Sequence, residues 1–415
     1  MCWTKKAADA IEPKPYRSKI PSSSRNSKSS SLGSNISSLN FAGYNSSHKN
    51  YSTNSSLSTL PSISRIKDHI SPENPNIYHF SEIRAATDGL SARRFSSSST
   101  SSSWRCTLRG RDVVVFQRKL RREMDTPQLS ERLFVTCKSH HSSLVNLLGA
   151  SISGSCIYLV YEYVKGASLS DCLRSNVNSS YTVLSSWLSR MQVASDIAHG
   201  LDYIHNFTGR NSGFVHNHIK SSSIVVTEES LSARICHFGT AELCGEVVED
   251  DRMDTEDSSA GNKTLRRTGS KTVKLEGTRG YMSPEFISSG IATQRSDVYA
   301  FGVVILELLS GEEALKYVFD DGGGYRRLSV IDMAREAVVR GDLRRWIDKR
   351  LKDSYPVEVA EKMLSLGLEC VEDDPLRRPD MGRAAHFISK LFLDSETWMK
   401  SFAMPSGISI SMGPR

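Results

Sequence analysis

The alternation of hydrophobic and polar residues changes character twice along the chain. Before about residue 78 it shows no period, and beyond that point it predicts four short elements: an amphipathic helix over 78–88, a strand over 113–116, a helix over 129–139 and a strand over 157–161. From Leu184 onward the patterns are mostly helical, with the longest predicted helices at 187–205 and 297–309. A small β-rich half followed by a larger helical half indicates an α+β fold.

Composition separates a folded region from two tails. Residues 18–70 are mainly Ser, Asn and Lys, which cannot bury enough apolar surface to offset the entropy of ordering, so 1–77 is predicted to be disordered. Residues 396–415 are predicted to be a flexible tail. The 415 residues can hold one large bilobal domain or two ordinary ones besides the tail. The net charge of +7 is not concentrated in any stretch, so no nucleic-acid partner is expected.

Cysteine usage and hydropathy indicate a cytoplasmic protein, at most attached to the cytosolic face of the plasma membrane. The eight cysteines are scattered without C-x-x-C spacing, and no apolar run reaches the length of about 20 residues that crosses a bilayer. Cys2, beside Lys5 and Lys6, is a candidate for lipidation by S-acylation, which would give weak peripheral membrane association. The alternative is an ordinary cysteine in a loose tail.

Five ordered motifs carry a family resemblance. G-T-R-G-Y-M-S-P-E at 277–285 resembles the end of the activation segment of plant receptor-like kinases, S-D-V-Y-A-F-G-V at 296–303 the opening of their central C-lobe helix, and D-P-L-R-R-P-D-M at 374–381 their D-P-x-x-R-P-x-M motif. L-V-Y-E-Y at 159–163 resembles the kinase hinge, and 141–149 resembles the segment after helix αC. Residues 78–395 are therefore identified as a member of the protein kinase superfamily, most similar to LysM-receptor-like and receptor-like cytoplasmic kinases. The resemblance implies a bilobal fold with a small β-rich N-lobe and a larger helical C-lobe.

The resemblance also implies structural roles for residues that match the family. Glu285 and Arg378 are expected to form an ion pair, and Asp297 opens the central helix of the C-lobe. His216 and Phe238, followed by Gly239, fit the hydrophobic spine that stacks through both lobes.

The nucleotide cleft implied by the resemblance is degenerate. The glycine-rich loop, whose missing side chains let backbone amides approach phosphates, corresponds to a serine run over 96–103 that is better interpreted as a flexible surface loop. Val115 takes the place of the usual alanine, and Gln117 that of the phosphate-pairing lysine. A register slip to Arg118 or Lys119 is the less favoured alternative. Arg132 falls at the αC glutamate, and Tyr161 and Tyr163 lie in the hinge.

The catalytic loop lacks the groups that phosphoryl transfer needs. In the segment H-N-H-I-K-S-S-S, His218 replaces the catalytic aspartate and Ser223 the metal-binding asparagine, while Lys220 is retained. His237 replaces the aspartate of D-F-G, although magnesium prefers oxygen ligands. The prediction is a pseudokinase with no functional catalytic residue and no cofactor. Three alternatives remain: weak ATP binding, an atypical Ser/Thr kinase with weak phosphotransfer, and a zinc or copper site on the two imidazoles.

A fold retained without its chemistry indicates a binding function. The expected role is a scaffold or allosteric partner of an active receptor-like kinase in plant signalling. An acidic run at 246–257 precedes Arg266 and Arg267, which make Thr268 and Ser270 candidate phosphorylation sites for a basophilic kinase. The alternative is an unmodified, solvated loop.

Overall fold

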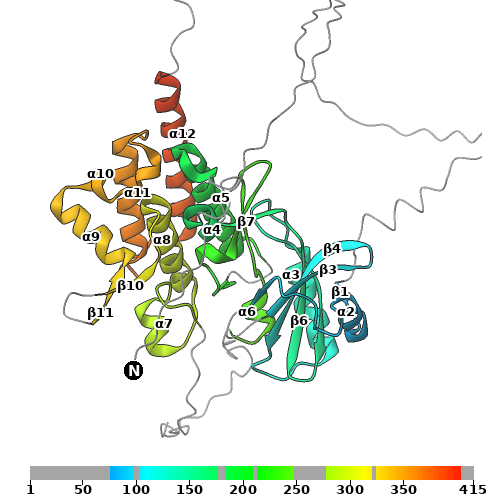
Figure 1. Cartoon of the computed structure of the whole chain (residues 1–415). Helices are drawn as coiled ribbons and strands as arrows, with labels where there is room; N and C mark the ends of the chain where they lie inside the picture. Colours follow the sequence, from blue (N-terminus) through cyan, green and yellow to red (C-terminus); the bar gives the residue numbers. More distant parts are fainter. Residues whose placement is uncertain are drawn as a thin grey trace, which may run out of the picture. The chain divides into compact units, whose positions relative to one another are not determined.

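The computed structural model describes residues 75–97, 102–175, 183–208, 213–246, 277–319 and 324–402. The lipidation candidate Cys2 and the phosphorylation candidates Thr268 and Ser270 lie outside these residues and stay predictions. Within them the structure has the predicted α+β fold: a sheet-bearing N-lobe comes first in sequence, and a mainly helical C-lobe follows (Figure 1).

Six strands form the sheet of the N-lobe, in the order β1-β5-β6-β4-β3-β2. Their bounds are β1 (Asn76–Ile77), β2 (Ser96–Ser97), β3 (Ser102–Leu108), β4 (Arg111–Lys119), β5 (Leu147–Ser153) and β6 (Cys156–Glu162). β4 is central and antiparallel to both β3 and β6. Its residues Val113, Val114 and Val115 are all buried, so both faces of this strand lie in the hydrophobic core.

The two ends of the serine run are strands, and the predicted loop residues 98–101 between them lie outside the described part of the chain. The ends belong to β2 and β3, and Ser102 and Ser103 pair with Gln117 and Phe116 of β4. Trp104, which directly follows, is buried and anchors the strand. Strand formation depends on packing and pairing more than on the intrinsic preference of each residue, which is why the composition misleads here.

Two helices accompany the sheet. α2 (Phe80–Ala86) is shorter than predicted because His79 caps its start in a reciprocal arrangement with Glu82. α3 (Thr126–Lys138) starts three residues before the predicted helix. The reason is Asp125, whose side chain accepts a hydrogen bond of 2.8 Å from the backbone nitrogen of Gln128.

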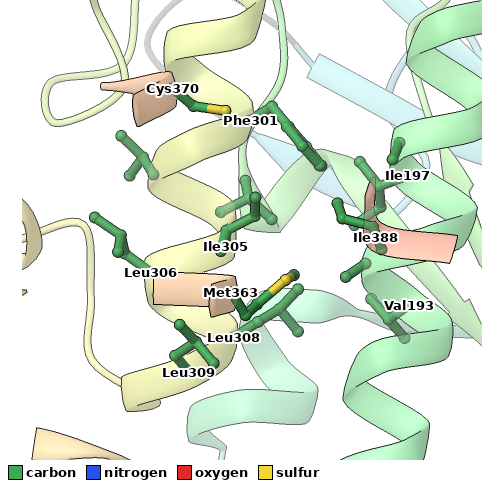
Figure 2. Close-up of a cluster of buried hydrophobic side chains, with 14 of the residues drawn as sticks. Val193, Ile197, Phe301, Ile305, Leu306, Leu308, Leu309, Met363, Cys370 and Ile388 are labelled. Atoms are coloured by element: carbon green, nitrogen blue, oxygen red, sulfur yellow. The ribbon is translucent and has the colours of Figure 1, made fainter. Parts of the chain in front are cut away.

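The C-lobe consists mainly of helices around a common core. They are α4 (Leu169–Arg174), α5 (Trp187–Asn206), α6 (Thr240–Leu243), α7 (Pro284–Ser289), α8 (Gln294–Ser310), α9 (Val330–Arg340), α10 (Leu343–Trp346), α11 (Val357–Cys370) and α12 (Met381–Phe402). Figure 2 shows Phe301, Ile305 and Leu308 of α8 in a cluster with Ile197 of α5 and Ile388 of α12. The two long helices predicted from periodicity, α5 and α8, are confirmed with slightly wider bounds.

Five short strands complete the C-lobe. β7 (Gly166–Ser168), β8 (Ile224–Thr227) and β9 (Ala233–Ile235) form a three-stranded sheet, and β10 (Leu315–Phe319) and β11 (Tyr325–Ser329) form an antiparallel hairpin. The catalytic-loop residues precede β8, and His237 follows β9, so this small sheet brings the two segments together.

The predicted domain boundaries need correction at both ends. Asn76 and Ile77 already pair with β5, so the fold begins before residue 78. At the other end α12 continues to Phe402, and the first part of the predicted tail is helical. Trp187 on α5 anchors this helix, because its indole nitrogen donates a buried hydrogen bond of 2.8 Å to Ser395.

All seven cysteines in the described part of the chain are free thiols. Among the described helices, none combines the length and the apolar character that crossing a bilayer requires.

Candidate functional site

Asp297, near the start of α8, holds the segment that corresponds to the catalytic loop. Its two carboxylate oxygens accept hydrogen bonds from the backbone nitrogens of His216 and Asn217, at 2.7 and 2.8 Å. Asn217 has a φ of +61°, in the left-handed region that asparagine tolerates better than most residues. The loop is therefore fixed by a buried carboxylate.

His216 is buried and neutral. Its Nδ1 accepts a hydrogen bond of 3.2 Å from the backbone of His218, so Nε2 carries the proton and donates to the Cys236 carbonyl at 2.9 Å. Burial lowers the pKa of His216 to about 4, although the carboxylate of Asp297 opposes the shift. Phe238, the other predicted spine residue, is also buried, with its ring centroid 6.0 Å from that of Phe214.

His218, Ser223 and His237 come together as the sequence predicts. The ring centroids of His218 and His237 are 6.2 Å apart, and Ser223 ends a short 3₁₀ turn, η3 (Ser221–Ser223), directly before β8. His237 has a φ of +69°, a strained conformation for a non-glycine residue. Burial, and then the positive charge of Arg118, hold the pKa of His237 well below its usual range. None of the three side chains offers a carboxylate.

Gln117 and Val115 do not lie in the nucleotide cleft, contrary to the prediction. The Gln117 amide nitrogen lies 3.3 Å from the Tyr158 hydroxyl, and Val115 packs in the same cluster as Tyr158 and Tyr78. The ring of Phe116 points to the other side of the sheet, with its centroid 4.6 Å from that of His237. Since successive strand residues face opposite sides, the expected register is wrong by one residue.

Arg118 is the strand cation at this site. It lies two positions beyond Phe116 and so on the same face, and after burial, the main cause, its charge lowers the pKa of both His237 and Lys220. The register slip that was the less favoured alternative is therefore the observed arrangement. Alternation between Phe116 and Arg118 was the available signal, but the apolar residues on both faces of β4 concealed it.

The two hinge tyrosines have different surroundings. The Tyr161 hydroxyl donates a buried hydrogen bond of 2.7 Å to the Phe238 carbonyl and lies 3.0 Å from Thr240 Oγ1. Tyr161 thus joins the hinge strand to the segment after His237. Tyr163 lies under the guanidinium of Arg105 of β3, which is 3.6 Å from its ring centroid.

The segment after His237 packs onto the N-lobe as α6. Gly239, with a φ of +81°, approaches Thr136 of α3 so closely that a Cβ atom would lie 2.3 Å from its methyl group. Arg132, predicted at the αC glutamate position, donates a hydrogen bond of 3.0 Å to the Glu242 carbonyl. Leu243 lies in the same hydrophobic cluster as the buried residues of α3. Arg132 therefore binds α6 through its guanidinium.

Glu246 brings a carboxylate to the site that sequence reasoning missed. Its Oε2 accepts a hydrogen bond of 3.0 Å from the Asn217 amide and lies 3.0 Å from His218 Nε2, although this second contact lacks hydrogen-bond geometry. Burial raises the pKa of Glu246, but His218 and Asn217 outweigh it and lower the pKa to about 2. Glu246 is the only residue of the acidic run at 246–257 that the structure describes. Its contact with His218 was not predicted because the two residues lie far apart in the sequence.

The predicted ion pair and one contact that was not predicted are also present. Arg378 and Glu285 form a bidentate ion pair with both nitrogen–oxygen distances at 2.7 Å. Lys220 donates a hydrogen bond of 3.1 Å to Thr278 Oγ1, which joins the catalytic-loop segment to the end of the activation segment.

The imidazoles do not form a metal site with other described residues. Within the ranges that the structure describes, no three His, Cys, Asp or Glu side chains are grouped so as to hold a metal ion. The structure thus supplies no third ligand for the zinc or copper alternative.

The family model for the protein kinase domain matches residues 105–389, well over half of the chain. The chain belongs to the protein kinase family. The resemblance that the motifs predicted is confirmed, and the kinase match contains all the site residues described above.

Curated relatives are plant receptor kinases. LysM domain receptor-like kinase 3 of Arabidopsis thaliana is 33% identical over 340 residues, which cover 80% of this chain and 48% of the relative. Chitin elicitor receptor kinase 1 of Arabidopsis thaliana is 33% identical over 293 residues, 70% of this chain and 42% of the relative. The chain thus spans about half the length of these relatives.

A solved structure confirms the fold. The pseudokinase domain of BIR2, described as an immune regulator of the RLK/Pelle family, superposes with a TM-score of 0.58 at 22% identity. The match covers 81% of this kinase and 96% of that chain. At this identity the similarity shows the shared fold alone.

Proposed function

We propose that the chain is a catalytically impaired protein kinase that acts as a scaffold or allosteric partner in plant receptor-kinase signalling. One observation carries the proposal: His218, Ser223 and His237 occupy the places of the base and of both metal-holding side chains. Phosphoryl transfer depends on metal ions that neutralise phosphate charge and on a base that orients the hydroxyl. Magnesium prefers oxygen ligands, and a neutral imidazole is a poor substitute for a carboxylate.

The segment after His237 supports the same conclusion. α6 packs against α3, where Arg132 binds it, and Glu246 lies against His218. The residue in the place of the base therefore faces the chain's own carboxylate. A substrate hydroxyl would have to displace this contact before it could reach His218.

A partner of the receptor-like kinase type is proposed from the relatives and from exposed apolar surface. The β10–β11 hairpin exposes Tyr317, Phe319 and Tyr325, and beside it lies a groove of about 600 Å³ whose lining includes Tyr317 and Ile287. Contiguous exposed apolar residues mark protein-binding surfaces. We propose that this hairpin contacts an active receptor-like kinase at the cytosolic face of the plasma membrane.

Phosphotransfer by the full-length chain tests the catalytic part of the proposal. The chain is incubated with labelled ATP, magnesium and a generic Ser/Thr substrate, beside the variant Arg118→Lys/His218→Asp/Ser223→Asn/His237→Asp. We expect no transfer by the unsubstituted chain above a reaction without protein. Transfer that His218→Ala abolishes would refute the proposal.

The same assay decides the alternative of an atypical Ser/Thr kinase. That reading is favoured by Glu246, because a carboxylate beside an imidazole can orient it as a base. If His218 acts in this way, Glu246→Gln would reduce transfer, whereas the proposed pseudokinase has no transfer to lose.

Binding to receptor-kinase domains tests the partner. Affinity of the full-length chain for a panel of plant receptor-like kinase domains is measured by calorimetry. Phe319→Ser/Tyr325→Ser is expected to weaken binding about tenfold or more, since exposed aromatic side chains commonly carry interface energy. Leu393→Ser on α12, equally exposed but remote in sequence, is the control. Equal effects of the two variants would refute a role of the hairpin.

A further inference from the structure

The degenerate catalytic site gathers buried polar atoms that have no partner. In the described part of the chain, seven buried side-chain polar atoms lack a hydrogen bond. Four of them belong to this one site: Arg118 Nε, Ser223 Oγ and His237 Nδ1 have no partner, and His218 Nε2 has only its ion-pair contact with Glu246. Native proteins satisfy nearly all buried polar groups, because an unpaired one costs about 1–3 kcal/mol. Such a concentration in one place indicates a site that can bind a ligand.

The four residues converge from separate parts of the fold. Arg118 comes from β4, His218 from the loop that Asp297 holds, Ser223 from η3, and His237 from the end of β9. Ser223 is 1% exposed, so its hydroxyl has no access to bulk water. We refer to these residues together with Lys220 as the Arg118 cluster.

The charge of the cluster suits an anion. Arg118 and Lys220 are close enough that the positive charge of Arg118 lowers the pKa of Lys220, after burial as the main cause. The same two cations also lower the pKa of the His237 imidazole, which stays neutral. Neither cation has a carboxylate partner among the residues that the structure describes, and together with the hydroxyl and imidazole donors they form an anion-binding arrangement. A magnesium ion would meet repulsion where kinases offer it carboxylates.

We propose that the Arg118 cluster binds a phosphate group without a divalent cation. Arg118 Nε and Ser223 Oγ donate to the phosphate oxygens, His237 donates through Nδ1, and Lys220 contributes its charge. The arrangement reverses the usual one, in which metal-holding carboxylates bind phosphate through magnesium. The inference does not depend on whether the chain transfers phosphate, so it can be refuted without refuting the proposed function.

Glu246 provides a further test of the inference, because its negative charge opposes phosphate binding. It lies against His218 at one side of the cluster and is fully ionised near neutral pH, with its pKa at about 2. A phosphate bound by the cluster would be repelled by this charge. Glu246→Gln keeps an oxygen that accepts the hydrogen bond from the Asn217 side-chain amide, but it removes the negative charge. The substitution should therefore tighten phosphate binding.

Calorimetry on the full-length chain tests ligand class and metal dependence. Inorganic phosphate, pyrophosphate, ATP and adenosine are titrated in EDTA at ionic strength held constant with sodium chloride, and again with excess magnesium. We expect every phosphate-bearing ligand to bind in EDTA and adenosine not to bind. If ATP binds about as tightly as pyrophosphate, the ligand of the site is a free phosphate or pyrophosphate. If ATP binds much more tightly, the ligand is a nucleotide. Binding that requires magnesium, or no binding of phosphate above chloride, overturns the proposal.

Matched variants locate the site. Ser223→Ala removes one hydrogen bond to a charged group and is expected to weaken phosphate binding about tenfold. Ser222→Ala, its exposed neighbour, should leave binding unchanged. Arg118→Gln should weaken binding at least as much as Ser223→Ala, and Glu246→Gln should strengthen it. Equal affinities of Ser223→Ala and Ser222→Ala for phosphate, or weaker phosphate binding by Glu246→Gln, would overturn the assignment. Circular dichroism of the two serine variants checks that each remains folded.

Discussion

Protonation of His216 is expected to make the fold sensitive to mild acid. The side chain is 1% exposed, and both its nitrogens are used by the backbone of His218 and Cys236. Burial lowers its pKa to about 4, and the charges of His218 and His205 act in the same direction against Asp297. Because the unfolded chain takes up the proton first, stability from His216 is complete above pH 6.5 and is lost as the pH falls toward 4.

The size of the effect follows from the two pKa values. Between a pKa of 6.5 in the unfolded chain and about 4 in the folded one, the free energy of unfolding falls by about 1.4 kcal/mol per pH unit. At pH 5 the loss relative to pH 8 is about 2 kcal/mol, a large part of the stability of an ordinary domain.

Urea unfolding at several pH values between 8 and 5 measures the loss. His216→Gln keeps a donor for the Cys236 carbonyl but cannot titrate. Its free energy of unfolding should therefore fall less steeply than that of the wild type, by about 1.4 kcal/mol per pH unit. His237 contributes a loss of the same sign to both proteins, and the difference between them therefore isolates His216. His386→Gln, an exposed histidine on α12, should keep the wild-type slope.

The slope separates titration from a merely structural role. A variant that only packs less well would be less stable by the same amount at every pH. If His216→Gln and the wild type lose stability in parallel between pH 6.5 and 5, the buried, neutral state assigned to His216 is wrong.

Three further changes are expected to alter stability in urea unfolding. Tyr161→Phe should cost about 1–3 kcal/mol, since it leaves a buried carbonyl unpaired, and no loss would refute that bond. Arg378→Gln should cost about 1–3 kcal/mol because it removes the buried guanidinium that binds the partly exposed Glu285 carboxylate, whereas Arg377→Gln on the surface should have little effect. Gly239→Ala should destabilise by about 1–3 kcal/mol, and Thr136→Ser should restore part of this loss by removing the clashing methyl group.

Local sequence motifs predicted much of the C-lobe. The helical periodicity at 187–205 and 297–309 is strong because these helices bury long faces in the core, and both are present as α5 and α8. The ion pair of Glu285 and Arg378 also followed from motifs, although 93 residues separate the partners. The substitutions His218, Ser223 and His237 were visible because each lies inside a short motif with fixed spacing.

Only the tertiary structure decided which residues face the site. β4 is central in its sheet and buried on both sides, so hydrophobic residues occur on either face and the sequence shows no alternation that would set its orientation. Pairing with β6 places Arg118, and not Gln117, toward His237. The contact of Glu246 with His218 likewise depends on how α6 packs against α3, and a fold-dependent contact of this kind leaves no local pattern. Sequence determined which catalytic groups are lost, and packing determined the charge of the site that replaces them.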